Sequence, residues 1–278
     1  MNLSLALSVF KLRQSTASVP ANSAEAQQFF DRLLTPPTPG SAEEIRWNTF
    51  IDGGVADGWW AKLDALYLWF AGANEGDALV NLIQGDYNSE RAQWSGAVTF
   101  TLNSGYSGGN VARVIRSNFN PSTAVGANFQ RDNHCAFVWV GNNAVIASTA
   151  IDDGVVASPA VATNNKIELW PRYNAGGAAY WNASGTEKAE AGITDSSGFH
   201  YIQRTAASGA NAAKHFRNDV EISADSSASS ALPNTEIYYL CGFLTRAAGF
   251  GAALSTGEKT ALYNRLVTLM TDIVGGVP

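Results

Sequence analysis

Short apolar segments, separated by clusters of Gly, Asn, Ser and Asp, run from about residue 75 to residue 254. Each segment has the length of a strand, and the clusters between them are typical of turns. No helical period intervenes, which excludes a repeated strand–helix–strand layout with a parallel sheet. We therefore expect a sandwich of two antiparallel sheets. The predicted strands lie near residues 97–102, 136–140, 144–148, 167–170, 200–204 and 237–244.

One amphipathic helix is predicted at the C-terminal end of the sequence. Ser255 and Glu258 form an S-x-x-E capping box, which satisfies two backbone donors and fixes where the helix begins. Gly275-Gly276 and Pro278 end it. Its apolar stripe, at three- and four-residue spacing, consists of Leu262, Leu266, Leu269 and Ile273.

The segment of about residues 21–74 is predicted to be helical. Ser23 is placed to cap a short helix that ends before Pro36-Pro37, and Ser41 with Glu44 forms a second capping box. The second helix is expected to stop at Gly53-Gly54. The apolar faces consist of Phe29, Phe30, Leu33 and Leu34 in the first helix and of Ile45, Trp47, Phe50 and Ile51 in the second.

A further helix is expected over residues 59–70, which are apolar almost all round. A segment with that pattern is buried between layers. Trp59, Trp60 and Trp69 would also suit stacking on sugars, but their helical spacing among leucines favours packing.

Residues 1–20 predict an extended arm with no core of its own, since alternating Leu and Val give way to a Ser, Thr and Pro stretch. Such an arm commonly docks onto a neighbouring subunit. Its cations follow the apolar stretch, which is shorter than a membrane span, so we expect neither a signal peptide nor membrane insertion. The chain thus divides into an arm (1–20), a helical segment (21–74) and a sandwich with its C-terminal helix (75–278).

Charged residues make up only 15% of the chain, against roughly 25% in an average soluble domain. The net charge is −6, and Lys and Arg are scattered, which disfavours nucleic acid as a partner because phosphate binding needs a concentrated basic face. Cys135 and Cys241 lie within apolar strand-like segments and are expected to be small buried hydrophobic residues rather than a disulfide.

Several catalytic and cofactor motifs are missing. There is no phosphate-binding G-x-x-x-x-G-K-[ST] motif, no dinucleotide fingerprint, no H-E-x-x-H and no G-x-S-x-G elbow. His134, His200 and His215 lie far apart without a carboxylate at metal-ligand spacing, and each is expected to be structural or to line a groove. No D-x-D-x-D calcium loop is present, and Asp152-Asp153 resembles a turn. We expect no cofactor and assign no metal ligand; calcium binding stays open, with Asp152 and Asp153 as the first candidates.

Glycoside hydrolysis requires two carboxylates flanking the scissile bond. Glu168, Glu221 and Glu236 each stand as a single acid on a predicted strand, and none repeats two residues on along the same strand. Two separate strands could still bring Glu168 and Glu236 together. The sequence therefore assigns no catalytic residue, and catalysis stays an alternative.

Two clusters of rings and polar side chains have the composition of a sugar site, where flat rings stack on sugars and polar groups bind the hydroxyls. The candidate glycan-binding residues are Trp170, Arg172, Tyr173 and Asn174 in the first cluster and Trp181 and Asn182 in the second, followed by His200 and Arg204. The alternative is that both tryptophans fill the sandwich core and the polar residues belong to hairpin turns.

Five ordered segments resemble a group of lectin-like tail or receptor-binding proteins of alphaproteobacterial phages and prophages. Trp60–Tyr67 resembles the family's W-a-K-L-D-a-L-Y helix, and Asp77–Asn81 its q-A-l-l-N segment. Gly105–Gly109 is similar to a G-f-t-G-d-G turn and Asn118–Ser122 to t-g-F-N-P-S, while Phe250–Ser255 resembles the stretch before the last helix. Together they extend over about residues 24–275 in the expected order.

The sequence also departs from the family. Asn81 is followed by Leu-Ile-Gln instead of W-k, Gly109 lacks the following Asp, and Asn110-Val-Ala replaces s-t-a. The resemblance implies a concanavalin A-like (laminin G-like) jelly roll with an N-terminal helical segment and one C-terminal helix. It implies this fold and a place in a phage particle, and it does not imply an active site.

The leading hypothesis is a non-enzymatic virion protein, made in the host cytoplasm, that acts as a tail fibre, spike or head decoration. Its sandwich would bind host surface polysaccharide, and its arm would bind other virion proteins. Because single lectin sites are weak, we expect a homo-oligomer, with a trimer favoured. The alternatives are a glycan depolymerase on the same fold and a purely structural virion component that binds no sugar.

Overall fold

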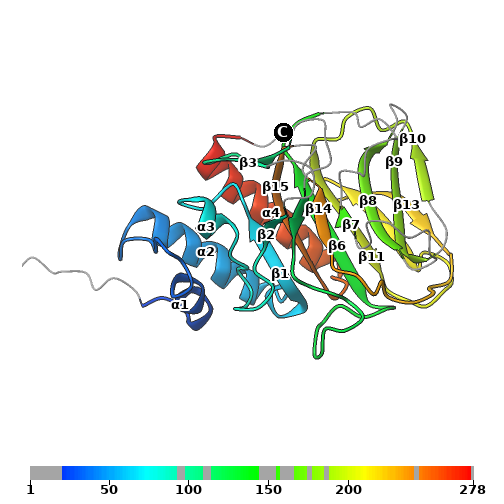
Figure 1. The fold of residues 1–278 in the computed structure, drawn as a ribbon, viewed down its shortest axis with the longest axis horizontal. Coiled ribbons are helices and arrows are strands. Elements are labelled where there is room, and N and C mark those ends of the chain that lie inside the picture. Colours follow the sequence, from blue (N-terminus) through cyan, green and yellow to red (C-terminus); the bar gives the residue numbers. More distant parts are fainter. Residues whose placement is uncertain are drawn as a thin grey trace, which may run out of the picture.

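The computed structural model describes residues 21–92, 98–108, 114–143, 155–156, 166–173, 177–184, 188–240 and 244–276. Two antiparallel sheets pack face to face, and helices cover the other face of the first sheet. In Figure 1, α1 (Ala24–Phe30) and α2 (Ala42–Ala56) lie at the left, and β9 (Gly177–Ser184) and β10 (Lys188–Ala191) of the second sheet lie at the right. The predicted mainly β jelly-roll sandwich, with an N-terminal helical segment and a C-terminal helix, is confirmed.

The described residues of the first sheet, sheet A, form eight strands in the order β13-β12-β11-β6-β15-β4-β3, with β1 also paired to β15. Its strands are β1 (Leu63–Leu68), β3 (Thr99–Thr101), β4 (Gly105–Ser107), β6 (His134–Val140), β11 (Gly198–Arg204), β12 (Ala213–Arg217), β13 (Val220–Asp225) and β15 (Thr245–Gly251).

In the part of the chain that the structure describes, the second sheet, sheet B, has seven strands in the order β10-β9-β8-β7-β14-β5-β2. Its strands are β2 (Glu90–Ala92), β5 (Val114–Arg116), β7 (Val155–Val156), β8 (Lys166–Tyr173), β9 (Gly177–Ser184), β10 (Lys188–Ala191) and β14 (Tyr238–Leu240). The predicted strands near 97–102, 136–140, 167–170 and 200–204 are confirmed as β3, β6, β8 and β11. The segment 237–244 contains β14, and residues 144–148 lie outside the described residues.

The expectation of a helix over residues 59–70 is wrong. A short 3-10 turn (Trp60–Lys62) leads into strand β1, which is buried along its whole length. Leu66 and Leu68 face the helices, while Ala65, Tyr67 and Trp69 face sheet B. A strand buried on both faces is a continuous apolar segment, which periodicity alone does not distinguish from a buried helix. The predicted burial between layers is confirmed.

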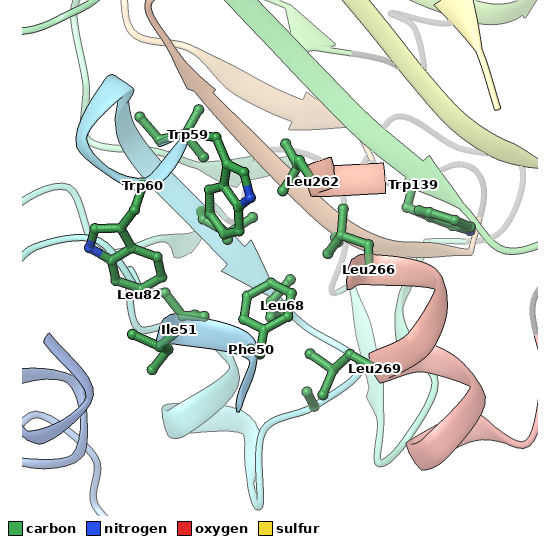
Figure 2. Packing of buried hydrophobic residues seen from close by; sticks show 14 of the residues in the cluster. Phe50, Ile51, Trp59, Trp60, Leu68, Leu82, Trp139, Leu262, Leu266 and Leu269 are labelled. Carbon is green, nitrogen blue, oxygen red and sulfur yellow. The ribbon is translucent and has the colours of Figure 1, made fainter. Parts of the chain in front are cut away.

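The three tryptophans of this segment are packing residues, as predicted. Trp59 and Trp69 are fully buried and Trp60 nearly so. The ring of Trp59 lies 5.7 Å from that of Phe50 on α2, and Figure 2 shows Trp59, Phe50 and Leu68 gathered between the helices and the sheet. None of the three is available for sugar stacking.

Helix α2 also differs from the sequence prediction, because it continues through Gly53-Gly54 to Ala56. At Gly53 a Cβ would collide with the side chain of Arg265, and at Gly54 it would collide with the ring of Trp59. The two glycines therefore permit close packing within the helix instead of ending it. The Ser41 hydroxyl accepts the Glu44 N–H as expected, but the Glu44 carboxylate accepts from Gly40 and Asn22.

Leu33 and Leu34 lie beyond the end of α1, which stops at Phe30. Leu33 packs partly on the helical core, whereas Leu34 is 78% exposed. Ser23 caps α1 as predicted, through a hydrogen bond from the Ala26 N–H to its hydroxyl.

Asn81, within one of the resembling segments, is a buried structural residue. Its side-chain oxygen accepts the N–H groups of Leu66 and Ile83, and its NH2 donates to the carbonyls of Asp64 and Asp86. The bonds with Leu66 and Asp64 hold the loop after β1 against that strand, and those with Ile83 and Asp86 hold the loop itself. Every side-chain group is thus satisfied inside the fold, as a buried amide requires.

Cys135 is buried in β6 with a free thiol, as predicted, and Cys241 lies outside the described residues. Burial raises the pKa of the Cys135 thiol to about 12. The thiol therefore stays protonated at neutral pH and is unsuited to nucleophilic chemistry.

The last helix, α4 (Thr256–Val274), confirms the capping box. The Ser255 hydroxyl accepts the Glu258 N–H, and the Glu258 carboxylate accepts the Ser255 N–H at 2.7 Å. Gly275 ends the helix with a φ of 81°, a conformation that favours glycine. Figure 2 shows Leu262, Leu266 and Leu269 pointing from α4 into the helical core.

We expect Ser255→Ala to lower the free energy of unfolding by about 1 kcal/mol, because it removes the N-cap acceptor. Urea denaturation followed by circular dichroism measures the change. Thr268→Ala is the matched control, since Thr268 is exposed on the same helix and bonds only a carbonyl one turn before it. An equal loss in both variants would contradict the cap's contribution.

Candidate functional site

Sheet B has one packed face and one face turned away from sheet A. Ile115, Leu169 and Tyr239 belong to the core between the sheets. Side chains alternate along a strand, so their neighbours Arg116, Trp170 and Tyr238 lie on the opposite face, here called the outer face. Glu168 lies there as well, between Ile167 and Leu169 of the core. The outer face thus collects rings and charged groups.

The register of sheet B places these residues in one row across the strands. Glu90 pairs with Arg116, Arg116 with Tyr238, and Tyr238 with Val156 of β7. Val156 pairs in turn with Glu168, and the backbone register continues from Glu168 to position 181 of β9. Neighbouring strands lie about 4.8 Å apart, so the five strands from β2 to β8 span roughly 19 Å.

An ion pair fixes one end of this row. Arg116 donates from Nε and Nη2 to Glu236 Oε2 at 3.0 and 2.7 Å, and the Asn118 N–H donates to the other carboxylate oxygen. The hydrogen bond to Glu236 raises the pKa of Arg116 above its ordinary value, with nearby Glu90 contributing. Burial, followed by the charge of Glu236, raises the pKa of Tyr238. The guanidinium and the phenol are therefore held in place, with the phenol protonated.

The row varies in exposure. Arg116 is 37% exposed at its side chain and Trp170 is half-buried, whereas Tyr238 and Glu168 are only 9% and 6% exposed. Partly exposed rings offer flat apolar area, and positioned carboxylates and guanidinium groups bind hydroxyls. This combination has the chemistry of a site for a sugar chain.

The sequence-predicted residues of β8 and β9 fall partly on this face. Trp170 lies on it, which excludes the alternative that it fills the core. Arg172 lies within the irregular stretch between Trp170 and Tyr173 and is half-buried, and its Nη1 donates to Asn143 Oδ1 at 2.9 Å. The positions of the others are given by the backbone alone: Tyr173 is in β8, Trp181 and Asn182 are in β9, and Asn174 lies outside the described residues.

The assignment of His200 and Arg204 to the sugar site is wrong. Both are fully buried in β11, a central strand of sheet A. His200 Nε2 bonds the carbonyl of Ser196 at 3.0 Å, and Arg204 donates to the carbonyls of Ala206 and Ser227. Polar residues at alternate positions of a strand share one face. Their spacing does not indicate whether solvent or another sheet covers that face.

The histidines are structural. The Nδ1 of His200 lies 3.3 Å from Nε2 of His215, whose Nδ1 lies 3.2 Å from Glu190 Oε2. His134 stacks on the ring of Phe129. Within the described residues no group of three or more His, Cys, Asp or Glu is arranged to hold a metal.

The three glutamates considered for catalysis have different surroundings. Glu221 lies on β13 of sheet A and pairs with Lys214 at 2.7 Å. Glu236 pairs with Arg116, while Glu168 lies two strands away from β14 on the same face, a strand spacing of roughly 10 Å. The fold thus brings Glu168 and Glu236 to one face and leaves Glu221 on the other sheet.

Sequence reasoning missed Arg116 and Tyr238. Each directly adjoins a core residue, Ile115 or Tyr239, so the alternation of a strand buried on one face was present in the sequence. The pairing of Arg116 with Glu236 joins residues 120 positions apart, and no local pattern indicates it.

A hollow of about 630 Å³ lies between α2 and α4. Its lining includes Ile45, Arg46, Arg265 and Asp272, and its one aromatic residue is Phe50, which is only 4% exposed. It offers no ring for a sugar to stack on. For this reason the outer face of sheet B is the better candidate.

Comparisons with known proteins give no family. No protein-family model matches the sequence, and no curated protein is significantly similar to it. In the described part of the chain, no helix combines the length and apolar character needed to cross a bilayer.

Solved structures show distant similarity only. Domain 4 of AbnA, a GH43 extracellular arabinanase from Geobacillus stearothermophilus, in complex with arabinotriose, has 14% identity and a TM-score of 0.47, over 73% of this chain and 98% of the domain. A Trypanosoma rangeli sialidase in complex with 2,3-difluorosialic acid has 10% identity and a TM-score of 0.48, over 88% of this chain and 38% of the sialidase. The binding domain of Paraclostridial Mosquitocidal Protein 1 has 16% identity and a TM-score of 0.43, over 75% and 53%. Similarities at this level carry no inference of function.

The burial of His200 predicts a loss of stability in mild acid. Burial, followed by the charge of His215, holds the pKa of His200 well below its ordinary 6.5. The unfolded chain therefore takes up the proton first, and the free energy of unfolding falls as pH drops below about 6.5. Urea denaturation should show a loss of about 1 kcal/mol from this group between pH 7 and pH 5.5.

His200→Gln keeps an N–H donor near the Ser196 carbonyl and removes the titration. We expect this variant to be less stable at pH 7 but to lose less on acidification than the parent. The same loss in both proteins would show that another group causes the acid sensitivity.

Proposed function

We propose that this protein binds a glycan on the outer face of sheet B and acts as a non-enzymatic adhesin of a phage particle. The observation that carries the binding site is the half-buried ring of Trp170 beside Glu168, on the face that also presents Tyr238 and the ion-paired Arg116. A ring flanked by fixed polar groups suits the alternating apolar and hydroxyl surfaces of a sugar.

The proposed role in a phage particle rests on the resemblance of five segments, in the same order, to lectin-like phage tail and receptor-binding proteins. One resembling segment contains Asn81, which binds its own fold on every side. Such segments support a shared scaffold rather than a shared ligand. In this proposal the particle presents the sandwich to host surface polysaccharide, and residues 1–20 attach to other virion proteins.

The absence of catalysis is also part of the proposal. Support comes from the ion pairs of two candidate acids, Glu236 with Arg116 and Glu221 with Lys214. The depolymerase alternative depends on Glu168 and Glu236, which share the outer face. A structural component without sugar binding is the third possibility, and both alternatives give distinct results in the assays below.

Trp170→Ala is expected to weaken binding to host surface polysaccharide about tenfold or more, because stacking on the ring is lost. The measurement is surface plasmon resonance on isolated polysaccharide, with thermal unfolding as the check on folding. Arg131→Ala is a matched control, since Arg131 is exposed and ion-paired only to its neighbour Asp132. Unchanged binding by the Trp170 variant would move the site away from the outer face.

Released reducing sugar, monitored in the same binding reactions, separates the adhesin from the depolymerase. Saturable binding without release supports the adhesin. Release that is abolished by Glu168→Gln and by Glu236→Gln would replace it with the depolymerase, and no binding at all would favour the structural component.

Oligomeric state is a separate prediction. Because affinity at single sugar sites is low, several copies acting together supply avidity. We expect a homo-oligomer, with a trimer favoured, and light scattering coupled to gel filtration gives the mass directly. A stable monomer of 29.5 kDa would contradict this expectation.

A further inference from the structure

The hollow between α2 and α4 is a groove that two helices border along their length. The lining on each helix includes residues three or four positions apart, which share one side of a helix. These residues are Ala42, Ile45 and Thr49 on α2, and Ala261, Arg265 and Leu269 on α4. A groove between two helices has the shape to bind a third segment of chain.

The groove is suited to an apolar segment. Most of its exposed lining surface is apolar, and Ile45, a large apolar side chain, is 56% exposed. Arg265 is ion-paired to Asp57, and Arg46 and Asp272 add one charge of each sign. A lining without net charge does not attract a strongly charged partner. The expected occupant is therefore apolar and has few charges.

Residues 3–10 of the same chain have this composition. They read Leu-Ser-Leu-Ala-Leu-Ser-Val-Phe, with no charged side chain, and they lie outside the described residues. Eight extended residues reach roughly 26 Å. The α2 side of the groove runs from Ala42 to Asp57, which is roughly 22 Å at the helical rise per residue. The segment is therefore long enough to cover the groove from end to end.

The described chain begins close to this groove. The Asn22 NH2 donates to Glu44 Oε1 at 3.0 Å, and the Asn48 NH2 donates to Asn22 Oδ1 at 2.7 Å, so Asn22 is held on α2. Ile45 follows Glu44 and lies about 100° further around the helix. The exposed Asp52 lies between these two directions. The path from Asn22 to the groove therefore crosses solvent-facing surface of α2.

The connecting chain is long enough for this path. Twelve residues separate Phe10 from Asn22, and they reach at most roughly 40 Å, whereas a helix with its side chains is only about 10–12 Å across. A segment tethered by a short linker acts at an effective concentration of about millimolar. A contact too weak to join separate molecules is therefore still formed within one chain.

From this placement we infer that residues 3–10 bind the groove between α2 and α4 of their own chain. The inference goes beyond the proposed function and does not depend on glycan binding. Attachment to other virion proteins, proposed above for residues 1–20, would then release this segment from the groove.

Cross-linking of the full chain tests the occupant directly. A photoreactive benzoylphenylalanine replaces Leu7, and mass spectrometry identifies the peptide to which it links. We expect a link to α2 or α4 in a product with the mass of one chain, 29.5 kDa. A link to these helices in a product of two chains would show that a second copy fills the groove, and the inference would be overturned. Links to neither helix would overturn it as well.

Thiol labelling gives an independent measurement. Thr49 is exposed and lines the groove, so Thr49→Cys reports its accessibility to a maleimide, with the parent chain as background for the native thiols. Adding Leu5→Asp and Leu7→Asp should speed this labelling about tenfold, because apolar contact with the groove is lost. Equal labelling rates with and without the two Asp substitutions would contradict the inference.

Two controls separate groove binding from general effects. Ser15→Asp with Thr16→Asp adds the same charge to the arm outside residues 3–10 and should leave the labelling of Thr49→Cys unchanged. Val55→Cys places a thiol at an exposed position of α2 that does not line the groove. Its labelling rate should not respond to the Leu5 and Leu7 substitutions, and an equal acceleration at both thiols would overturn the inference.

Glycan binding, measured on the same proteins, distinguishes this inference from the proposed function. A chain that binds no polysaccharide but cross-links within one copy contradicts the proposed function and supports the inference. A chain that binds polysaccharide but forms no link to α2 or α4 does the reverse.

Discussion

Burial of sheet A on both faces is the constraint on which the rest of the structure depends. Its strands alternate between two apolar cores, one shared with the helices and one shared with sheet B. At Gly249 in β15 a Cβ would collide with the ring of Phe137 and the carbonyl of Ala65, and at Gly251 it would collide with the backbone of Lys62 and Leu63. These glycines let β1 approach β15, so the helical layer and the sandwich share one sheet.

The same constraint determines where a binding face is available. The central strands of sheet A, β6, β11 and β15, have no free face, because helices cover one side and sheet B covers the other. Within the described residues, sheet B packs on sheet A through one side, and polar residues stand at alternate positions on the other. Arg116, Glu168 and Tyr238 each adjoin a core residue on the same strand. The alternation of side chains along these strands, which places apolar residues in the core, therefore also places the residues of the candidate site on the outer face.

Preorganisation links the candidate site to stability. Arg116 and Glu236 hold each other, and Asn118 adds a backbone hydrogen bond, so the site does not have to order these groups when a ligand arrives. A surface ion pair of this kind contributes little to folding. Its effect on the face is to fix the guanidinium of Arg116 beside Tyr238.

By itself, the sequence determined the features that depend on neighbours along the chain. Ser23 and Ser255 were correctly predicted as helix caps, since the hydroxyl of a cap and the N–H that donates to it lie three residues apart. Short strands between turn clusters correctly predicted the sandwich. Tertiary structure decided the rest. Residues 63–68 form a strand because both faces are covered, and apolar periodicity does not report the second face. His200 and Arg204 are interior because sheet B covers them, while Arg116 meets Glu236 only through the pairing of β5 with β14. The local sequence indicates where helices and strands form and which side chains share a face of a strand. Whether another layer covers that face depends on packing between residues far apart in the chain.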